Sequence, residues 1–119
     1  MDRIPFTLPD INYGLTEITG FLYLEQEFLV FEVETAVFGE FDKEQRIIKV
    51  EPSALEAVYL ERGWLKDQLL IRPKKRELLE ALPGDFASEV PLKIKRKHRR
   101  KTERLASILR KRAKRQSIL

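Results

Sequence analysis

Short runs in which apolar and polar residues alternate constrain this chain more than any other feature of its sequence. The stretch of residues 50–72, VEPSALEAVYLERGWLKDQLLIR, contains several such runs in succession. In order, it predicts a strand end, a corner at Pro52-Ser53, a strand over 55–60, a hairpin at Arg62-Gly63-Trp64 and a strand over 68–72. Period-two alternation over such short segments is typical of antiparallel strands rather than helices.

Similar runs occur on both sides of that stretch. They predict further strands over residues 20–25, 28–38, 46–50 and 90–96. The spacing from Leu55 to Val58 departs from strict alternation and predicts a turn or bulge there. In the last of these strands, Leu92 and Ile94 are expected to face the core, whereas Lys93, Lys95 and Lys97 are expected to face outward.

Two segments depart from this alternation and are predicted to be helical. Residues 74–82 form a short candidate helix that ends at Pro83-Gly84. Residues 98–115 contain neither proline nor glycine, and Leu105, Ile108 and Leu109 fall at positions i, i+3 and i+4. The second helix would therefore present a narrow apolar stripe to the strands, while the rest of its surface is basic.

These elements predict a mainly β (β+α) fold, a small antiparallel two-sheet barrel capped by a C-terminal amphipathic α-helix. A chain of 119 residues fits one small domain. Residues 1–13 contain two prolines and alternate little, so we expect an N-terminal extended arm there. The barrel with its helix is then expected over 14–112, and a basic tail end over 113–119.

Charge is distributed unevenly along the chain. Residues 93–119 contain 13 of the 23 Lys and Arg but only one acid, Glu103, which gives this segment a net charge of +12. Residues 1–92 hold the remaining 10 basic and 18 acidic residues and carry a net charge of −8. An acidic body with a basic end predicts a segment that docks on its own body or meets an anionic partner.

The residue types that most enzymes and metalloproteins need are scarce here. The chain has no cysteine, which excludes disulfides, thiolate nucleophiles and cysteine-type zinc sites, and His98 is its only histidine. The carboxylate pairs Glu25/Glu27 and Glu32/Glu34 are explained by a solvated strand face as well as by acid–base chemistry. We therefore expect no enzyme activity, no catalytic residues, no metal and no cofactor.

Hydropathy indicates where such a chain would reside. The longest apolar runs are four residues, as in residues 28–31, which is far too short for a membrane-spanning helix. The first thirty residues lack a basic start followed by an apolar run, so no signal peptide is predicted. We expect a cytoplasmic protein.

Two groups of residues are candidates for binding. Trp64 lies at a predicted hairpin tip, where it would either fold back as core or stand exposed as an aromatic anchor for a partner or membrane interface. The predicted basic surface of the terminal helix comprises Arg99, Arg100, Lys101, Arg104, Lys111, Arg112, Lys114 and Arg115. These cations could neutralise phosphates, or they could form a solvated face that balances the acidic body.

The order of turns and apolar positions resembles the pleckstrin-homology-like (PH-like) superfold, particularly its GRAM-type and bacterial members. The resemblance covers residues 14–112. Its first half rests on the motifs Gly20-x-Leu22-x-Leu24, Leu29-x-Phe31 and Val50-Glu51-Pro52-Ser53-x-Leu55-x-x-Val58. Its second half rests on the Arg62-Gly63-Trp64 hairpin before Leu69-x-Ile71 and on residues 90–94 before the helix. The superfold includes lipid-binding, peptide-binding and scaffolding modules, so the resemblance implies a binding domain without naming its ligand.

One departure from that pattern bears on lipid binding. Lipid-binding members carry Lys and Arg around the loop between their first two strands, which here would be Glu25-Gln26-Glu27. Two carboxylates would repel a phosphorylated headgroup, so we expect no phosphoinositide at that loop.

The sequence thus predicts a non-catalytic PH-like binding or scaffolding module. Its expected partner is a protein, or a second copy of the chain that pairs along an exposed strand edge. The alternative is electrostatic binding of nucleic acid or an anionic membrane surface through the basic helix, residues 93–115. That segment has no aromatic residue to stack on bases, which argues against sequence-specific single-strand recognition.

Overall fold

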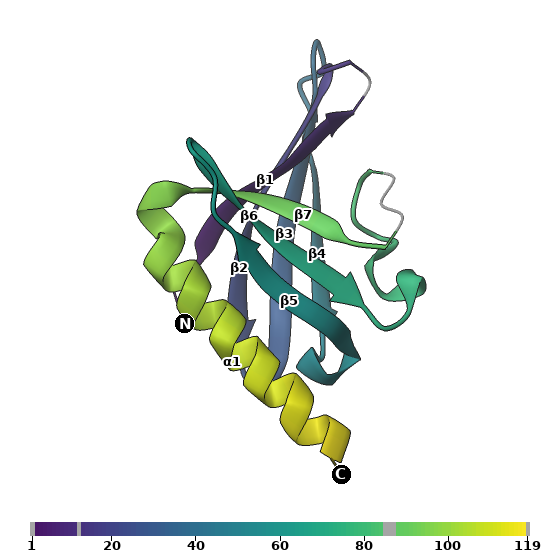
Figure 1. The fold of residues 1–119 in the computed structure, drawn as a ribbon. Coiled ribbons are helices and arrows are strands. Elements are labelled where there is room, and N and C mark those ends of the chain that lie inside the picture. Colours follow the sequence, from purple (N-terminus) through teal and green to yellow (C-terminus); the bar gives the residue numbers. More distant parts are fainter. Residues whose placement is uncertain (1, 12, 85–87, 119) are drawn as a thin grey trace.

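The chain folds into one antiparallel sheet of seven strands followed by a long helix (Figure 1). This computed structural model describes residues 2–11, 13–84 and 88–118, and the side chains of all of these except residues 10 and 115–118. The strands are β1 (Ile4–Ile11), β2 (Thr16–Glu25), β3 (Phe28–Val37), β4 (Glu44–Val50), β5 (Leu55–Glu61), β6 (Lys66–Pro73) and β7 (Val90–Lys95). Their order in the sheet is β4-β3-β2-β1-β7-β6-β5, with the helix α1 (Arg99–Ile118) after the last strand.

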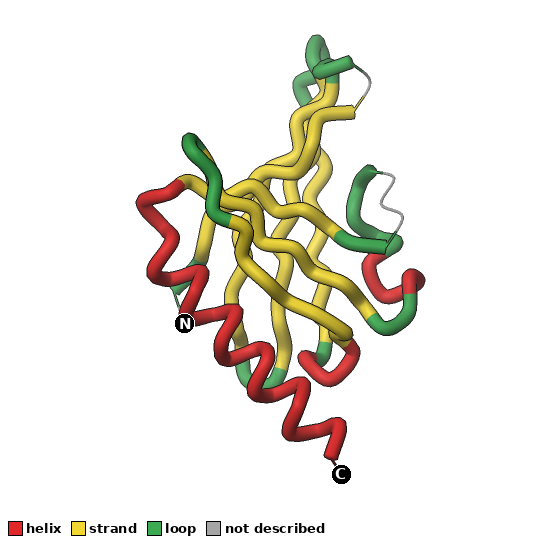
Figure 2. The backbone as a smooth tube through the Cα atoms, in the orientation of Figure 1, coloured by secondary structure: helices red, strands yellow, loops and turns green. Residues whose placement is uncertain are grey.

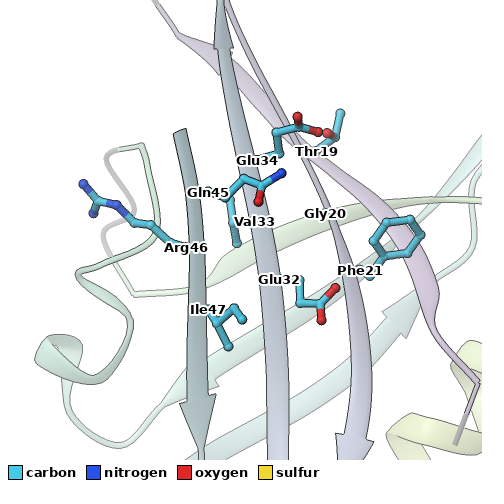
Figure 3. A pocket seen from close by; sticks show the side chains of 9 residues that line it. All are labelled: Thr19, Gly20, Phe21, Glu32, Val33, Glu34, Gln45, Arg46 and Ile47. Atoms are coloured by element: carbon cyan, nitrogen blue, oxygen red, sulfur yellow. The ribbon is translucent and has the colours of Figure 1, made fainter. Parts of the chain in front are cut away.

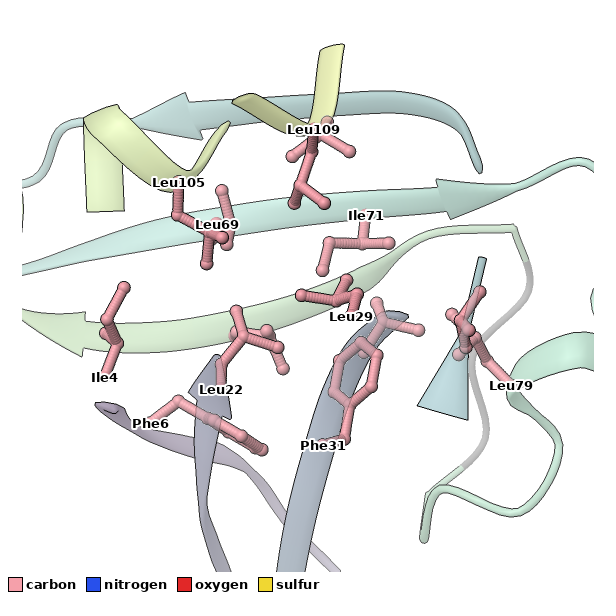
Figure 4. Packing of buried hydrophobic residues seen from close by; sticks show 14 of the residues in the cluster. Ile4, Phe6, Leu22, Leu29, Phe31, Leu69, Ile71, Leu79, Leu105 and Leu109 are labelled. Carbon is pink, nitrogen blue, oxygen red and sulfur yellow. The ribbon is translucent and has the colours of Figure 1, made fainter. Parts of the chain in front are cut away.

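The sheet bends so that β5, β6 and β7 cross the face of β2, β3 and β4 (Figures 1 and 2). Apolar side chains from both halves meet in one buried cluster, in which Leu22, Leu29 and Phe31 lie opposite Leu69 and Ile71 (Figure 4). This cluster exists because alternate residues of each strand face the same side of the sheet. The predicted inward positions of β2, β3, β6 and β7 are confirmed.

A glycine in the middle of β2 leaves room for an aromatic ring from the neighbouring strand β1. A Cβ atom on Gly20 would lie 2.2 Å from the Glu32 carbonyl oxygen and 2.7 Å from Cζ of Phe6. The Phe6 ring occupies that space and meets the Phe31 ring edge-on, with 6.4 Å between the ring centroids. Any larger residue at position 20 would displace this aromatic pair from the core.

The C-terminal helix lies along β5 and the 3₁₀ turn η1 (Pro52–Ala54). Leu105 and Leu109 are fully buried, so each contributes about 1.5–3 kcal/mol of apolar burial. Arg110 of the helix donates from Nη1 to the Val58 carbonyl oxygen of β5 at 2.9 Å. The predicted apolar stripe is therefore confirmed, and the helix also covers part of an edge strand.

Three predictions about local structure are wrong. Residues 4–11 are not an arm but β1, which pairs with both β2 and β7 near the middle of the sheet. Residues 74–82 form only a 3₁₀ turn, η2 (Arg76–Leu79), rather than a helix. The terminal helix continues to Ile118, beyond the expected end at residue 115. The expected irregularity between Leu55 and Val58 is confirmed, because the β5–β6 register shifts between Leu55 and Ala57.

Candidate functional site

The turn between β5 and β6 places two large apolar side chains in solvent. Trp64 is 86% exposed and Leu65 is 77% exposed, and we call this pair the Trp64 tip. The expectation that Trp64 folds back as core is wrong. The position matches the alternative that we predicted, an exposed aromatic anchor at the end of a hairpin.

A buried carboxylate holds the Trp64 tip from beneath. The Asp67 side chain is completely buried at the start of β6, and it accepts two hydrogen bonds of 2.7 Å from Nε and Nη2 of Arg99. Its Oδ1 also accepts a 3.1 Å bond from the Gly63 backbone N–H. The Arg99 hydrogen bond is the main reason that the pKa of Asp67 lies below its usual range. Asp67 therefore stays ionised and joins the hairpin to the first residue of α1.

Further contacts limit the movement of the same hairpin. Arg96 of the 3₁₀ turn η3 (Arg96–His98) donates from Nη1 to the Trp64 carbonyl oxygen at 3.0 Å. Arg62 forms a 2.6 Å ion pair with Glu103 of α1. A Cβ atom on Gly63 would lie only 2.0 Å from the Lys66 carbonyl oxygen, so the turn closes as tightly as it does only with glycine. The tip is thus pre-organised rather than loose.

Beside the hairpin, the outer face of the sheet contains a hollow rich in cations. It has a volume of about 380 Å³ and lies over β1, β2, β6 and β7, with one residue from β3. We call it the lysine groove, because four lysines dominate its lining. The lining includes Phe21, Lys66, Lys93, Lys95, Lys97, His98 and one acid, Glu34 of β3. Lys66 lies directly opposite Lys95 across the β6–β7 ladder, an arrangement of like charges that is unfavourable in the absence of an anion. Among the residues that the structure describes, none of these four lysines has an ion-pair partner.

The single histidine lines this groove, and its surroundings lower the pKa of its imidazole. Burial is the main cause that lowers the pKa of His98, and Lys97, Lys101 and Lys95 lower it further by repulsion. An anion bound among the lysines would remove part of that repulsion and favour the protonated imidazole.

A second hollow of about 260 Å³ adjoins the groove on the outer face of β2, β3 and β4 (Figure 3). Phe21 lines both hollows. Glu32 accepts 2.7 Å hydrogen bonds from Arg3 and from the Tyr23 hydroxyl, and an Oε1 of Glu34 lies 3.7 Å from the Lys43 ammonium. Both carboxylates of this predicted pair are therefore engaged by cations. The outer face changes from acidic on β3 to basic on β6 and β7.

The basic residues predicted on α1 do not form one surface. Arg99 is in the Asp67 pair, Lys101 lies 3.6 Å from Asp2, and Arg112 donates to the Gln26 carbonyl oxygen at 3.1 Å. The exposed members with no recorded polar partner in the described part of the chain are Arg100, Arg104, Lys111 and Lys114. The Arg115 side chain lies outside the described residues. Part of the basic helix thus neutralises its own body, as the solvated-face alternative expects.

The lysine groove contains residues that we did not select from the sequence, namely Lys66 and Phe21. Lys93, Lys95 and Lys97 were predicted to face outward, and this alternation was the available signal. Their meeting with Lys66 and Phe21 depends on β7 lying between β1 and β6, which no local pattern reveals.

The loop on which the phosphoinositide prediction rested is the wrong one. Because β1 precedes the first strand that we predicted, residues 25–27 connect the second and third strands. The first two strands are joined by residues 12–15, Asn-Tyr-Gly-Leu, which contain no Lys or Arg. The expectation that no phosphoinositide binds at the first loop remains a prediction, now for a different reason.

Across the described residues, no group of three or more His, Cys, Asp and Glu side chains could hold a metal ion. No helix in the described ranges has an apolar stretch of the length needed to cross a membrane. In comparisons with known proteins, no family model, no curated protein and no solved structure matches the chain.

Proposed function

We propose that this protein is a non-catalytic, PH-like binding module that docks on an anionic membrane surface through the Trp64 tip and the lysine groove. The PH-like part, including a barrel formed by the bent sheet, is supported by seven antiparallel strands followed by a terminal helix. The docking part rests on the chemistry of one face of the molecule.

The exposed Trp64 tip is the observation that carries the proposal. Indole rings favour the boundary between headgroups and hydrocarbon because they combine an apolar body with one polar N–H group. Leu65 adds apolar area that water solvates poorly. Because Asp67, Arg96 and Arg99 fix the turn, insertion of the tip would require little additional ordering.

The surrounding charges favour an anionic surface. Lys66 is two residues from Trp64, and Lys95 and Lys97 flank Arg96, whose guanidinium binds the tip backbone. Each Lys or Arg close to an anionic bilayer contributes about 1 kcal/mol to binding. The lysine groove would hold phosphate-bearing headgroups while the Trp64 tip enters the interface.

The protein contains one tryptophan, so its own fluorescence tests the proposal. We expect a blue shift of Trp64 emission, and co-sedimentation, with vesicles of phosphatidylcholine and phosphatidylglycerol. Pure phosphatidylcholine vesicles should produce neither. Trp64→Ala should abolish co-sedimentation without loss of folded structure, because the side chain is exposed.

Two double variants separate the groove from general positive charge. Lys93→Gln with Lys95→Gln should weaken binding by about 30-fold, on the basis of about 1 kcal/mol per lysine. Lys111→Gln with Lys114→Gln removes the same charge from α1, outside the groove, and should have a clearly smaller effect. Equal losses in the two variants would contradict a role for the groove.

Nucleic acid is the competing ligand class, and the same experiment distinguishes it. If duplex DNA or RNA displaced the protein from vesicles and bound without a change in Trp64 emission, the surface would be a phosphate-backbone binder rather than a membrane-docking face. Unchanged emission with every anionic vesicle would overturn the proposal.

A further inference from the structure

A second exposed apolar group lies at another end of the molecule. Tyr13 and Leu15 lie in the connection between β1 and β2, and Phe38 and Phe41 lie in the connection between β3 and β4. Both connections are at the top of Figure 1, where the strands extend beyond the rest of the sheet. We call these four side chains the aromatic tip.

The aromatic tip is joined across its two connections. The Phe38 backbone N–H donates to the Leu15 carbonyl oxygen at 2.7 Å, so the two loops are held side by side. Tyr13, Gly14 and Gly39 have positive φ angles of 56°, 83° and 86°, which turn the chain sharply at this end. Phe38 is 84% exposed and Phe41 is fully exposed, so both rings lack cover from the described chain.

The charges beside the aromatic tip are opposite to those beside the Trp64 tip. Glu17, Glu40 and Asp42 are exposed near the aromatic rings, and the one nearby lysine, Lys43, lies 3.7 Å from Glu34. An acidic surround disfavours an anionic bilayer at this end. It favours a partner that is apolar at its centre and basic at its rim.

We infer that the aromatic tip binds the Trp64 tip of a second copy of this chain. Trp64 and Leu65 would meet the aromatic rings, while Lys66 and Arg96 would meet Glu40 and Asp42. The two surfaces differ, so the contact is heterologous, and each copy in a pair keeps one tip unoccupied. The structure thus assigns head-to-tail assembly, with chains longer than two copies at high concentration.

The size of the two tips sets the strength of this contact. Stable interfaces bury about 1,600 Å² in total, whereas two hairpin tips offer only a few apolar side chains each. The association is therefore weak and reversible, and the charges at its rim make it sensitive to salt. The inference involves the Trp64 tip but does not depend on its binding to a membrane. Because both contacts would use the same tip, anionic vesicles should compete with self-assembly for it.

Sedimentation velocity over a concentration series tests the inference. The average mass of the wild-type protein should rise above the 14.0 kDa monomer as concentration increases, and should fall again with added salt. Two double variants, Phe38→Ser with Phe41→Ser and Trp64→Ala with Leu65→Ser, should each remain monomeric. All four side chains are exposed, and circular dichroism checks that both variants fold.

Mixing the two variants gives the decisive result. Each retains the tip that the other lacks, so an equimolar mixture should form a species of twice the monomer mass and nothing larger. A mixture that remains monomeric, or a wild-type protein that is monomeric throughout or stops at a closed dimer, would overturn the inference. The Phe38/Phe41 variant should still bind anionic vesicles, so loss of assembly and loss of membrane binding remain distinguishable.

Discussion

Trp64 and Leu65 on one tip, and Phe38 and Phe41 on the other, are all more than three-quarters exposed, yet the chain supports them differently. Beneath the Trp64 tip lies a buried Asp67–Arg99 pair, with a second ion pair to α1 beside it. The aromatic tip has one recorded backbone bond between its connections and turns that rely on positive φ angles. The difference shows that exposure alone does not describe a binding surface.

The surrounding charge separates the two tips further. Cations surround the Trp64 tip and acids surround the aromatic tip. An anionic surface should therefore bind the Trp64 tip, whereas a basic partner should bind the aromatic tip. A buried ion pair is costly to form but strongly destabilising to break, which suits a tip whose geometry must be constant. A change in the support or the charge of one tip, with the other tip as the reference, therefore tests the difference between them.

Removal of the carboxylate beneath the Trp64 tip should have the largest effect. Asp67→Ala leaves Arg99 without its partner, and we expect a loss of about 3 kcal/mol in the free energy of unfolding, the low end for a broken buried pair, since Arg99 is partly exposed. Urea denaturation measures this loss. Phe38→Ala on the aromatic tip should change the free energy of unfolding very little. Comparable losses of stability in the two variants would show that the two tips are not supported differently.

Reversal of charge at the aromatic tip should make it resemble the Trp64 tip. With Glu40→Lys and Asp42→Lys, anionic vesicles should bind about 30-fold more tightly, on the basis of about 1 kcal/mol for each added lysine near the surface. Vesicle co-sedimentation measures the gain, and Glu77→Lys with Glu80→Lys at η2, away from both tips, is a control of equal charge. An equal gain in both variants would show that total charge, rather than tip chemistry, determines binding.

Amide hydrogen exchange should show directly that the Trp64 tip is held more firmly than the aromatic tip. The Gly63 amide is bonded to a buried carboxylate, whereas no bond from the Gly14 amide is recorded within the described ranges. We expect the Gly63 amide to exchange at least about tenfold more slowly, since a hydrogen bond to a charged group contributes about 1.5–3 kcal/mol. Asp67→Ala should remove this protection while leaving Gly14 unchanged.

The smallest expected effect is a pH dependence confined to the lysine groove. The lowered pKa of His98 keeps the imidazole neutral in the unbound protein, and a bound anion should raise that pKa towards its usual value near 6.5. Vesicle binding should therefore take up a proton and strengthen a few-fold as pH falls from about 7.5 to about 6. His98→Gln should abolish this dependence. The aromatic tip contains no histidine, so Phe38→Ser with Phe41→Ser should leave this pH dependence unchanged.

Much of the fold could be predicted because its signals are local. Alternating residues located β2 to β7, and the spacing of Leu105 and Leu109 identified the buried side of α1. Strand β1 was missed because Pro5 and Pro9 obscure it, although Ile4, Phe6 and Leu8 alternate inward and are all buried. The helix expected over 74–82 did not form, because apolar spacing in so short a segment does not distinguish a helix from a 3₁₀ turn.

The candidate site was less predictable, for a different physical reason. Trp64 was located at a hairpin tip, but the turn is supported by the pairing of Asp67 with Arg99, which lies 32 residues further along the chain. The role of Arg99 as the partner of a buried acid has no local signal either. A run of basic residues indicates total charge, but only strand pairing decides which cations meet on one face.

The pairing of Asp67 with Arg99 also orders events during synthesis. The hairpin residues leave the ribosome well before Arg99, which is 32 positions behind Asp67. Until the first turn of α1 emerges, Asp67 has no guanidinium to neutralise it, and burial of the carboxylate is unfavourable. The Trp64 tip therefore reaches its final shape only after the first turn of α1 has been synthesised.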